Sequence, residues 1–396
     1  MTATLIALSM CTFALGFAEF VAVSLVPFIA IQTKLPVSSV GMMIGAYAIG
    51  VSIGAPTLSA ILSRAPRRTV LMLSMLVFAS GNLATALSGS LPMLLITRLV
   101  AGLMHGVVIA LASSTAAASV SSQRSGKAIA NVFAGLTVAL MIGVPLGTYA
   151  GGKFPWQTIF FAIAVLGLMS AAALSMLTHN IASAETHTKR QAKLIWSTVV
   201  DIQILHPVVV TALTYAGSFT GFTYISVLLE RETHLAAGGI TAMFGVYGVC
   251  AAIGNAIGGK LVDRFGSRSA TLTVVIGLAI AMGGACVFAA SMRAMVIVMA
   301  VWGLASFGAV PVLQNTVINA SRKRANSNAD VASGTNIAAF NIGIAAGSVI
   351  GGIASKYSPY APTIVALLPL FIAAVLASRL VTRSTSATLE AEPLKN

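Results

Sequence analysis

The chain has 396 residues, of which 57% are hydrophobic and only 8% are charged, whereas about 25% of residues are charged in soluble domains. So few charges cannot cover a water-facing surface, and the mean hydropathy of +0.95 applies to the whole length, which leaves no sizeable soluble domain. The net charge of +14 would indicate nucleic-acid binding only on a soluble domain with one basic face, so that class is excluded and an integral membrane protein is predicted.

Twelve apolar runs of about 17–25 residues follow one another along the chain. The first, from about Leu5 to Ile31, has no basic residue before it and is too long for the core of a signal peptide, so we expect it to remain as a span. The runs are continuous rather than alternating, which excludes a β-barrel and predicts an all-α bundle of twelve transmembrane helices. The predicted spans are 5–30, 40–62, 70–88, 92–118, 128–150, 157–177, 207–229, 239–260, 270–290, 294–318, 331–354 and 361–381.

The basic residues gather on one side of this arrangement. Loops after the even-numbered spans, together with the C-terminal tail, hold 17 of the 23 Lys and Arg residues, the other side holds 5, and Arg98 alone lies within a span. Because Lys and Arg collect in cytoplasmic loops, we expect a multi-pass protein of the inner cell membrane with both termini in the cytoplasm.

One connection differs from the rest. The segment between spans 6 and 7 is long and polar, so it predicts two six-helix halves, 1–177 and 207–381, joined by a cytoplasmic linker at 178–206 and followed by a tail at 382–396. The halves match at an offset of 200 residues: Met43 with Met243, Tyr47 with Tyr247, Gly54 with Gly254, Arg68 with Arg268, and Gly143, Gly147, Gly151 with Gly343, Gly347, Gly351. Two parallel repeats around a site at the membrane midplane are typical of secondary transporters.

Several segments resemble one transporter family. Residues 259–268, GKLVDRFGSR, resemble the signature loop of the major facilitator superfamily, and Arg98 with Gly102 and Gly106 resembles its span-4 motif. Gly135 and the run 143–147, GVPLG, resemble its antiporter motif. The segments 18–20, 105–106 and 336–343 are similar to the drug:proton antiporter branch related to arabinose efflux permeases. The resemblance implies a major facilitator fold, a substrate of small organic molecules and a proton as the coupled ion.

The first-half copy of the signature loop departs from the family pattern. It has Ser59, Ser63 and Pro66 where the second half has two glycines and Asp263. In the family the loop aspartate acts as a charged cap for a helix of the opposite half, so we expect Asp263 near residues 125–127 and a weaker lock at Ser63. The resemblance assigns a conformational switch to Ser63, Arg64, Asp263, Arg264, Arg268, Gly143, Pro145 and Gly147.

Glu19 is the only one of nine acidic residues that falls well inside a predicted span. A charged carboxylate at membrane depth is costly, which makes a reversible proton site of it, although a static ion pair or bonds to neighbouring hydroxyls would also satisfy it. Arg98, Gly102 and His105 share one face of span 4, and His105 can exchange a proton near neutral pH. We therefore predict proton coupling by Glu19, Arg98 and His105. The alternative for Arg98 is that it snorkels or binds backbone carbonyls.

The substrate cavity is predicted from polar and aromatic residues at membrane depth. Tyr215, Phe219 and Phe222 form a stripe at helical spacing, which fits either a cavity wall or ordinary helix packing. Asn336 and Asn341 lie about 140° apart around a helix, so we expect only one of them to face the cavity. The predicted cavity residues are Tyr47, Tyr215, Phe219, Phe222, Gln314, Asn336 and Asn341.

No enzyme motif is found, and Cys11, Cys250 and Cys286 lie singly in apolar runs, so no cofactor, metal site or disulfide is predicted. The favoured function is proton-coupled efflux by a protein that works as a monomer in contact with membrane lipid. An uncoupled sugar or amino-acid facilitator and a transport-inactive membrane sensor or scaffold are the alternatives.

Overall fold

The computed structural model describes residues 3–62, 65–118, 125–177, 201–324 and 329–380. Within these ranges the secondary structure is helical throughout, and twelve helical segments are long and apolar enough to cross a membrane, as predicted. The first half comprises α1 (Ala3–Thr33), α2 (Val37–Ile53), η1 (Gly54–Leu58), α3 (Ser59–Leu62), α4 (Arg67–Ala86), α5 (Leu91–Ala118), α6 (Ser125–Gly151) and α7 (Trp156–Leu177). The second half comprises α9 (Ile202–Phe222), α10 (Ile225–Arg231), α11 (Ala237–Phe288), α12 (Met292–Arg322), α13 (Ala329–Ala354) and α14 (Ala361–Ser378).

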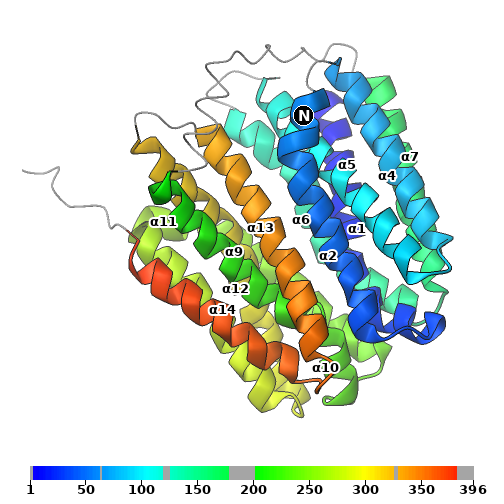
Figure 1. Cartoon of the computed structure of the whole chain (residues 1–396), viewed down its shortest axis with the longest axis vertical. Helices are drawn as coiled ribbons and strands as arrows, with labels where there is room; N and C mark the ends of the chain where they lie inside the picture. Colours follow the sequence, from blue (N-terminus) through cyan, green and yellow to red (C-terminus); the bar gives the residue numbers. More distant parts are fainter. Residues whose placement is uncertain (1–2, 63–64, 119–124, 178–200, 325–328, 381–396) are drawn as a thin grey trace, which may run out of the picture.

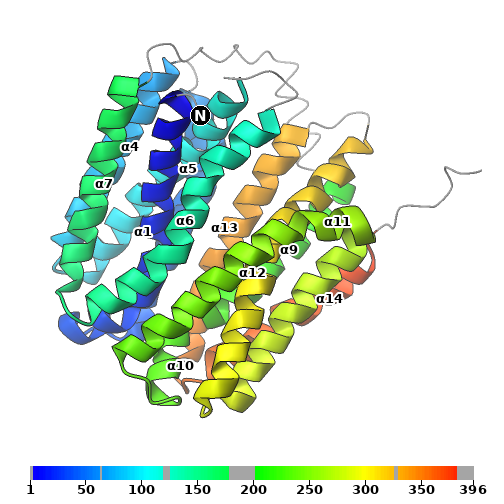
Figure 2. The same cartoon turned by 180° about the vertical axis from the view of Figure 1, so that it is seen from behind.

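The two halves are separate bundles that meet along two pairs of helices. Figures 1 and 2 show the first half beside the second, with α2 next to α13 on one side and α6 next to α11 on the other. These two pairs make the main contacts between the halves in the described part of the chain. Contacts between the two groups of helices are therefore concentrated at α2 with α13 and at α6 with α11.

The two ends of the bundle differ in charge. Successive spans alternate in direction, so the start of α4 and the ends of α12 and α14 lie at the end of the bundle where α1 begins, marked N in Figure 1. Basic residues that follow even-numbered spans stand at these helix ends, such as Arg67, Lys323 and Arg379. We call this the basic end. Figure 1 shows α10 at the opposite end. By the helix bounds, the basic residues of this end are Lys34, Lys153, Arg231, Arg293 and Lys356.

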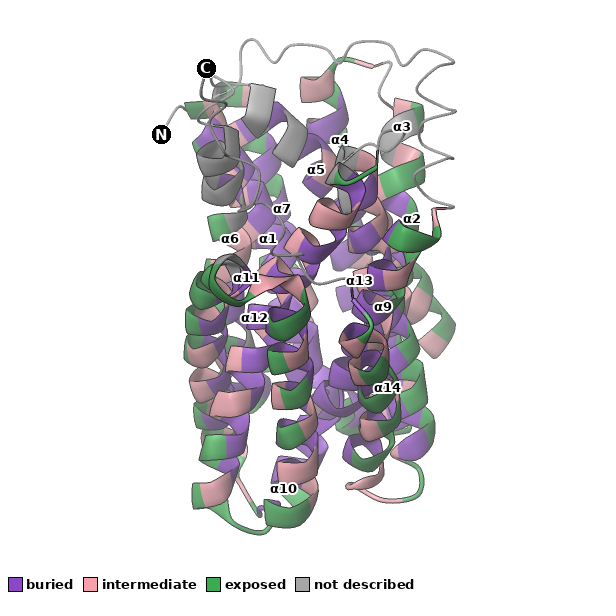
Figure 3. Ribbon diagram, turned by 90° about the vertical axis from the view of Figure 1, so that its left-hand side faces the viewer, coloured by how far each residue is buried: buried purple, intermediate pink, exposed green. Residues whose placement is uncertain are grey.

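The outward faces of the helices are apolar. Figure 3 shows buried residues on the inner faces of the helices and exposed residues on their outer faces. Many exposed residues are large and hydrophobic, such as Leu368, 63% exposed, and Phe371, 67% exposed. A surface of this kind fits hydrocarbon rather than water, in agreement with the membrane assignment.

Two predicted spans, 2 and 7, differ from a single regular helix. Span 2 widens into a π-turn, η1, because Pro56 has no N–H for the helical ladder. Span 7 starts at Ile202 instead of 207, since Asp201 caps its first turn by accepting a hydrogen bond from the Gln203 amide at 2.9 Å. The predicted linker is correspondingly shorter at this end.

Span 7 also breaks, between α9 and α10. The Tyr224 hydroxyl donates to the Ser348 carbonyl of α13 at 3.0 Å and fixes the break. A broken helix is tolerated at membrane depth where it is buried in protein, and Tyr224 is only 2% exposed. The uniformly apolar sequence gave no sign of this break.

The two signature loops differ in backbone geometry. In the second half, Gly266 has φ 75° and ψ 165°, a conformation that favours glycine, and it divides α11 into the helices of spans 8 and 9. The position in the first half is Pro66, which has φ −56° and precedes α4. The predicted contrast between Ser63 and Asp263 lies outside the described residues, as do Arg64 and the side chain of Asp263. Arg264 and Arg268 are described and exposed.

The internal repeat is visible in equivalent close contacts. A Cβ atom on Gly102 of α5 would collide with the Tyr47 carbonyl of α2, and one on Gly303 of α12 would collide with the Tyr247 carbonyl of α11. Both glycines are needed because backbone meets backbone at these crossings. The offset is 200 for the tyrosines and 201 for the glycines, so spans 2 and 4 pack as spans 8 and 10 do.

The predicted glycine ladders also lie at helix crossings. Gly143 and Gly147 of α6 face Phe17 and Val21 of α1. Pro145 lies between these two glycines in α6. Gly347 of α13 faces the Ala216 carbonyl of α9 in the same way. These contacts support the structural interpretation of the ladders, and their role in switching stays a prediction.

Candidate functional site

A cavity of about 150 Å³ lies between the two halves at the level of Glu19. Its first-half wall is made by α1, α2, α5 and α6, and its second-half wall by α9, α12 and α13. The lining residues are Glu19, Val51, His105, Ile109, Leu136, Thr211, Tyr215, Val310, Leu313, Gln314, Asn336, Ile337, Phe340 and Asn341. The cavity is therefore mainly apolar, with ionisable groups on one wall and amides on the other.

Glu19, His105 and Tyr47 form a chain of polar contacts at the first-half wall. His105 Nδ1 lies 3.9 Å from Glu19 Oε2 and 2.8 Å from the Tyr47 hydroxyl, which also lies 3.4 Å from the Leu15 carbonyl. When the Tyr47 hydroxyl donates to the Leu15 carbonyl, it accepts a hydrogen bond from His105 Nδ1–H. When the hydroxyl donates to His105 instead, Nδ1 is unprotonated and accepts. The tyrosine hydroxyl can therefore serve either tautomer of the histidine.

Arg98 lies behind this chain, fully buried. Its guanidinium carbon is 4.0 Å from the centre of the Tyr47 ring, and Nη2 donates to the Ala18 carbonyl at 3.2 Å. Arg98 is thus held by an aromatic face and a backbone carbonyl and does not snorkel. Among the ion pairs of the described residues, Glu19 is paired with His105 and not with Arg98.

Two nitrogens of Arg98 remain without a hydrogen bond. Within the described ranges, Nε and Nη1 are buried and have no acceptor. A buried cation with free N–H groups is costly unless an anion approaches it. The carboxyl group of Glu19 follows directly after the residue whose carbonyl Arg98 binds, so it is the nearest candidate anion.

This polar set belongs to the first half alone. The packing of Gly102 and Gly303 aligns Arg98 with Met299 and His105 with Ser306. Tyr247, the counterpart of Tyr47, forms a hydrogen bond to Ser306. The second half therefore repeats the tyrosine and its hydrogen bond, but neither the arginine nor the histidine.

The second-half wall presents amide groups to the cavity. Asn336 Nδ2 donates to Gln314 Oε1 at 2.7 Å, while Asn336 Oδ1 is buried and accepts no hydrogen bond from the described residues. Asn341 Nδ2 donates to the Ile337 carbonyl at 3.0 Å.

The expectation that only one of the two asparagines faces the cavity is wrong. Asn336 and Asn341 both line it. They lie at the two edges of an arc of α13 about 140° wide, with Phe340 and Ile337 between them, and the cavity spans this whole arc.

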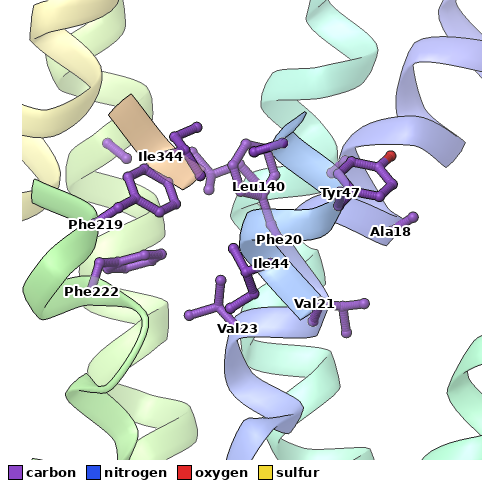
Figure 4. Packing of buried hydrophobic residues seen from close by; sticks show 14 of the residues in the cluster. Ala18, Phe20, Val21, Val23, Ile44, Tyr47, Leu140, Phe219, Phe222 and Ile344 are labelled. Atoms are coloured by element: carbon purple, nitrogen blue, oxygen red, sulfur yellow. The ribbon is translucent and has the colours of Figure 1, made fainter. Parts of the chain in front are cut away.

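The aromatic stripe of α9 divides between cavity and core. Tyr215 lines the cavity, and its ring lies against that of Phe340 with centroids 3.7 Å apart. Phe219 and Phe222 do not line it, contrary to the prediction. Phe222 packs against Tyr247 with centroids 4.6 Å apart, and Figure 4 shows both phenylalanines among buried apolar side chains.

Tyr47 is also absent from the cavity wall, because its hydroxyl is turned to His105 and its ring to Arg98. Figure 4 shows its ring apart from those of Phe219 and Phe222.

Sequence reasoning missed the role of Phe340, Thr211 and Leu136 in the wall. Phe340 lies within the segment 336–343 that carried the family resemblance, whereas Leu136 had no signal. In the ranges described, no three His, Cys, Asp or Glu residues are grouped as a metal site would need.

Comparisons with known proteins agree on one family. The family model described as Major Facilitator Superfamily matches residues 8–329 and 209–396. YtbD of Bacillus subtilis (strain 168), an uncharacterized MFS-type transporter, is 37% identical over 349 residues, which cover 88% of this chain and 87% of YtbD. A chloramphenicol resistance protein of Streptomyces lividans is 30% identical over 349 residues, 87% of each chain.

The fold has solved counterparts. A bacterial homolog to the human lysosomal transporter Spinster, in an inward-facing and unoccupied conformation, superposes with a TM-score of 0.76 at 13% identity. The match covers 95% of this chain and 96% of that one. At this identity the likeness concerns the fold alone.

Proposed function

This chain belongs to the Major Facilitator Superfamily, and on that premise we propose that it is a proton-coupled exporter of small organic compounds. Membership makes it a multi-pass membrane transporter and not an enzyme. The observation that carries the finer proposal is the position of Glu19, an ionisable carboxyl group at membrane depth that lines a cavity between the halves.

Glu19 has two neighbours that suit its two protonation states. When Glu19 is charged, the N–H groups of Arg98 that have no acceptor can bind its carboxylate. When Glu19 is protonated, its 3.9 Å contact with His105 no longer requires a charged imidazole. We assign proton binding to Glu19, charge compensation to Arg98 and relay or positioning to His105. Proton exchange at Glu19 then changes the contacts between α1 and α5, which links it to helix movement.

The proton gradient is large enough to drive export. One proton that enters across about 150 mV releases ~3.5 kcal/mol, which supports a gradient of a neutral solute of several hundred-fold. The cavity carries one acid and several amides on an apolar wall, a lining that suits neutral amphipathic molecules. The similarity to a chloramphenicol resistance protein supports the same class.

Substrate entry requires a wider cavity than the present one. Ligand cavities for drug-sized molecules measure about 300–1,000 Å³, whereas this one measures about 150 Å³. At the opposite end the halves touch, since a Cβ atom on Gly41 of α2 would overlap the Tyr224 ring. We infer that substrate enters from the basic end, which the distribution of Lys and Arg assigns to the cytoplasm.

Transport in proteoliposomes tests the function. A thermal-shift screen of neutral amphipathic compounds, with chloramphenicol among them, first selects a stabilising ligand, whose uptake is then measured with and without an imposed pH gradient. A proton-coupled exporter accumulates the ligand only with the gradient. An uncoupled facilitator transports it regardless of the gradient, and a sensor or scaffold binds it without transport.

The coupling residue is tested by Glu19→Gln, which removes the proton site and keeps the shape of the side chain. We expect accumulation driven by the pH gradient to fall to the background while exchange of labelled for unlabelled ligand continues. Glu230→Gln, which changes an exposed acid at the opposite end, is the matched control and should behave like the parent protein. Full gradient-driven accumulation by Glu19→Gln would contradict the assignment.

A further inference from the structure

A second cavity lies at the basic end of the second half, far along the chain from Glu19. Its volume is about 560 Å³, larger than that of the cavity between the halves. It is enclosed by the ends of α9, α12 and α14 and by Ser267, next to the bend at Gly266. The lining residues are Ile202, Gln203, Leu205, His206, Pro207, Val209, Ser267, Thr316, Asn319, Ala320, Lys323, Leu376, Arg379 and Leu380.

Each helix contributes one continuous face to this cavity. On α12 the lining positions 316, 319, 320 and 323 follow helical spacing, as do 202, 205, 206 and 209 on α9. Polar and charged groups such as Gln203, Asn319 and Lys323 line it together with apolar groups such as Leu205 and Leu376. The cavity is therefore amphipathic.

The polar part of the cavity is positively charged. Lys323 and Arg379 are exposed at its rim, His206 is half-buried beside them, and among the described residues no acid lines it. Asp201 is adjacent in sequence, but its carboxylate accepts from Arg324 Nε at 2.8 Å and caps α9. Among the residues that the structure describes, neither rim cation forms an ion pair, so both can bind an anion from outside the chain.

The apolar part of the cavity continues onto the lipid-facing surface. Ile202, Leu205 and Val209, in the first turns of α9, are 71%, 37% and 38% exposed. A soluble anion would contact the rim and leave this wall unused. A molecule with an anionic head and an alkyl chain would use both parts.

We propose that this cavity is a binding site for an anionic phospholipid. The phosphate group is held by Lys323 and Arg379, Gln203 and Asn319 offer hydrogen bonds to the head group, and one acyl chain lies along Leu205 and Leu376. Basic cavities between helix ends on the cytoplasmic side are suited to such head groups. The site does not depend on proton coupling or on the transported substrate.

Lipid binding to the purified full-length protein tests the site directly. Native mass spectrometry would follow titrations with phosphatidylglycerol, with phosphatidylcholine of the same acyl chains and with inorganic phosphate alone. We expect phosphatidylglycerol to bind much more tightly than phosphatidylcholine, and to raise the thermal unfolding midpoint. Equal affinity for both lipids, or saturation by inorganic phosphate at the same concentration, would overturn the proposal.

Charge and shape variants separate this site from general attraction between lipid and protein. The double variant Lys323→Gln and Arg379→Gln should bind phosphatidylglycerol about thirtyfold more weakly, which corresponds to about fivefold for each basic residue. Leu376→Trp should weaken it by filling the apolar part without changing charge. The matched control, Lys34→Gln with Arg293→Gln, removes the same charge at the opposite end and should bind as the parent does. An equal loss in the control, or none in either test variant, would refute the site.

Discussion

At the scale of single residues, Tyr47 contacts both His105 and Arg98, two of the three residues that were predicted from their charge alone. Its hydroxyl lies 2.8 Å from His105 Nδ1, and its ring supports Arg98 at 4.0 Å. Glu19, Arg98 and His105 are thus coupled through one aromatic side chain. The sequence placed Tyr47 in the repeat with Tyr247 but could not show that its hydroxyl is directed to a histidine.

Tyr47→Phe removes this hydrogen bond and retains the ring under Arg98. We expect a loss of about 1–3 kcal/mol of stability, because His105 Nδ1 loses its buried partner. The pH dependence of transport should also change, since the histidine next to Glu19 is no longer held in place. Thermal unfolding and transport rates across pH 5–8 measure the two effects.

Tyr247→Phe is the matched control for this prediction. It removes the equivalent hydroxyl and its bond to Ser306, a residue that does not titrate. It should lose a comparable amount of stability and keep the pH profile of the parent. A pH profile that changes equally in both variants would mean that Tyr47 has no special link to Glu19, the proposed proton site.

At the scale of helices, the crossings between spans 2 and 4 and between spans 8 and 10 depend on single glycines. Gly303→Ala would bring a Cβ atom into the Tyr247 carbonyl, a backbone group that cannot rotate away. We expect a destabilisation of about 1–3 kcal/mol and a lower thermal midpoint.

Gly283→Ala provides the control within the helical segment before Phe288. A Cβ atom there meets nothing within 4 Å, so the substitution should be neutral or slightly stabilising through its helix propensity. Equal effects of the two substitutions on the thermal midpoint would show that the crossing is looser than the contact indicates.

Helices were more predictable than their interruptions. Hydropathy over about 20 residues depends on many side chains, so it identified all twelve spans within a few residues. The break at Thr223 and Tyr224 is held by two hydrogen bonds to Ser348 of another helix, which leave no local pattern in the sequence. The kink at Gly266 was marked by glycine, but only as part of a loop motif.

In the candidate site, too, some residues could be predicted from the sequence and others could not. Glu19 was identified because an acid within an apolar run is rare and costly. The positions of Phe219 and Phe222 depended instead on how three helices rotate, and a spacing of i, i+3 fits a cavity wall and a core equally well. Burial of charge could therefore be predicted, whereas the identity of the cavity wall could not.

At the scale of the whole molecule, the structure holds the opposite end closed. Gly41 of α2 faces the Tyr224 ring at the break in span 7, and Ser38, in the first turn of α2, is only 6% exposed. The backbone of Ser38 lies next to Gly352 of α13. If alternating access operates, these contacts must separate when the cavity opens toward this end.

Gly41→Leu should therefore favour the state that is open at the opposite end, because a leucine cannot share the space of the Tyr224 ring. A cysteine at Ser38, in a chain whose native Cys11, Cys250 and Cys286 have been replaced, reports this opening through its labelling by a membrane-impermeant maleimide. Labelling should rise several-fold with Gly41→Leu, while Gly283→Leu, which adds the same side chain where a Cβ atom has open space, should leave it unchanged. Since transport requires both states, Gly41→Leu should also slow ligand accumulation even though it lies outside the cavity. Unchanged labelling together with normal accumulation would mean that the contact between Gly41 and Tyr224 does not close the transport path.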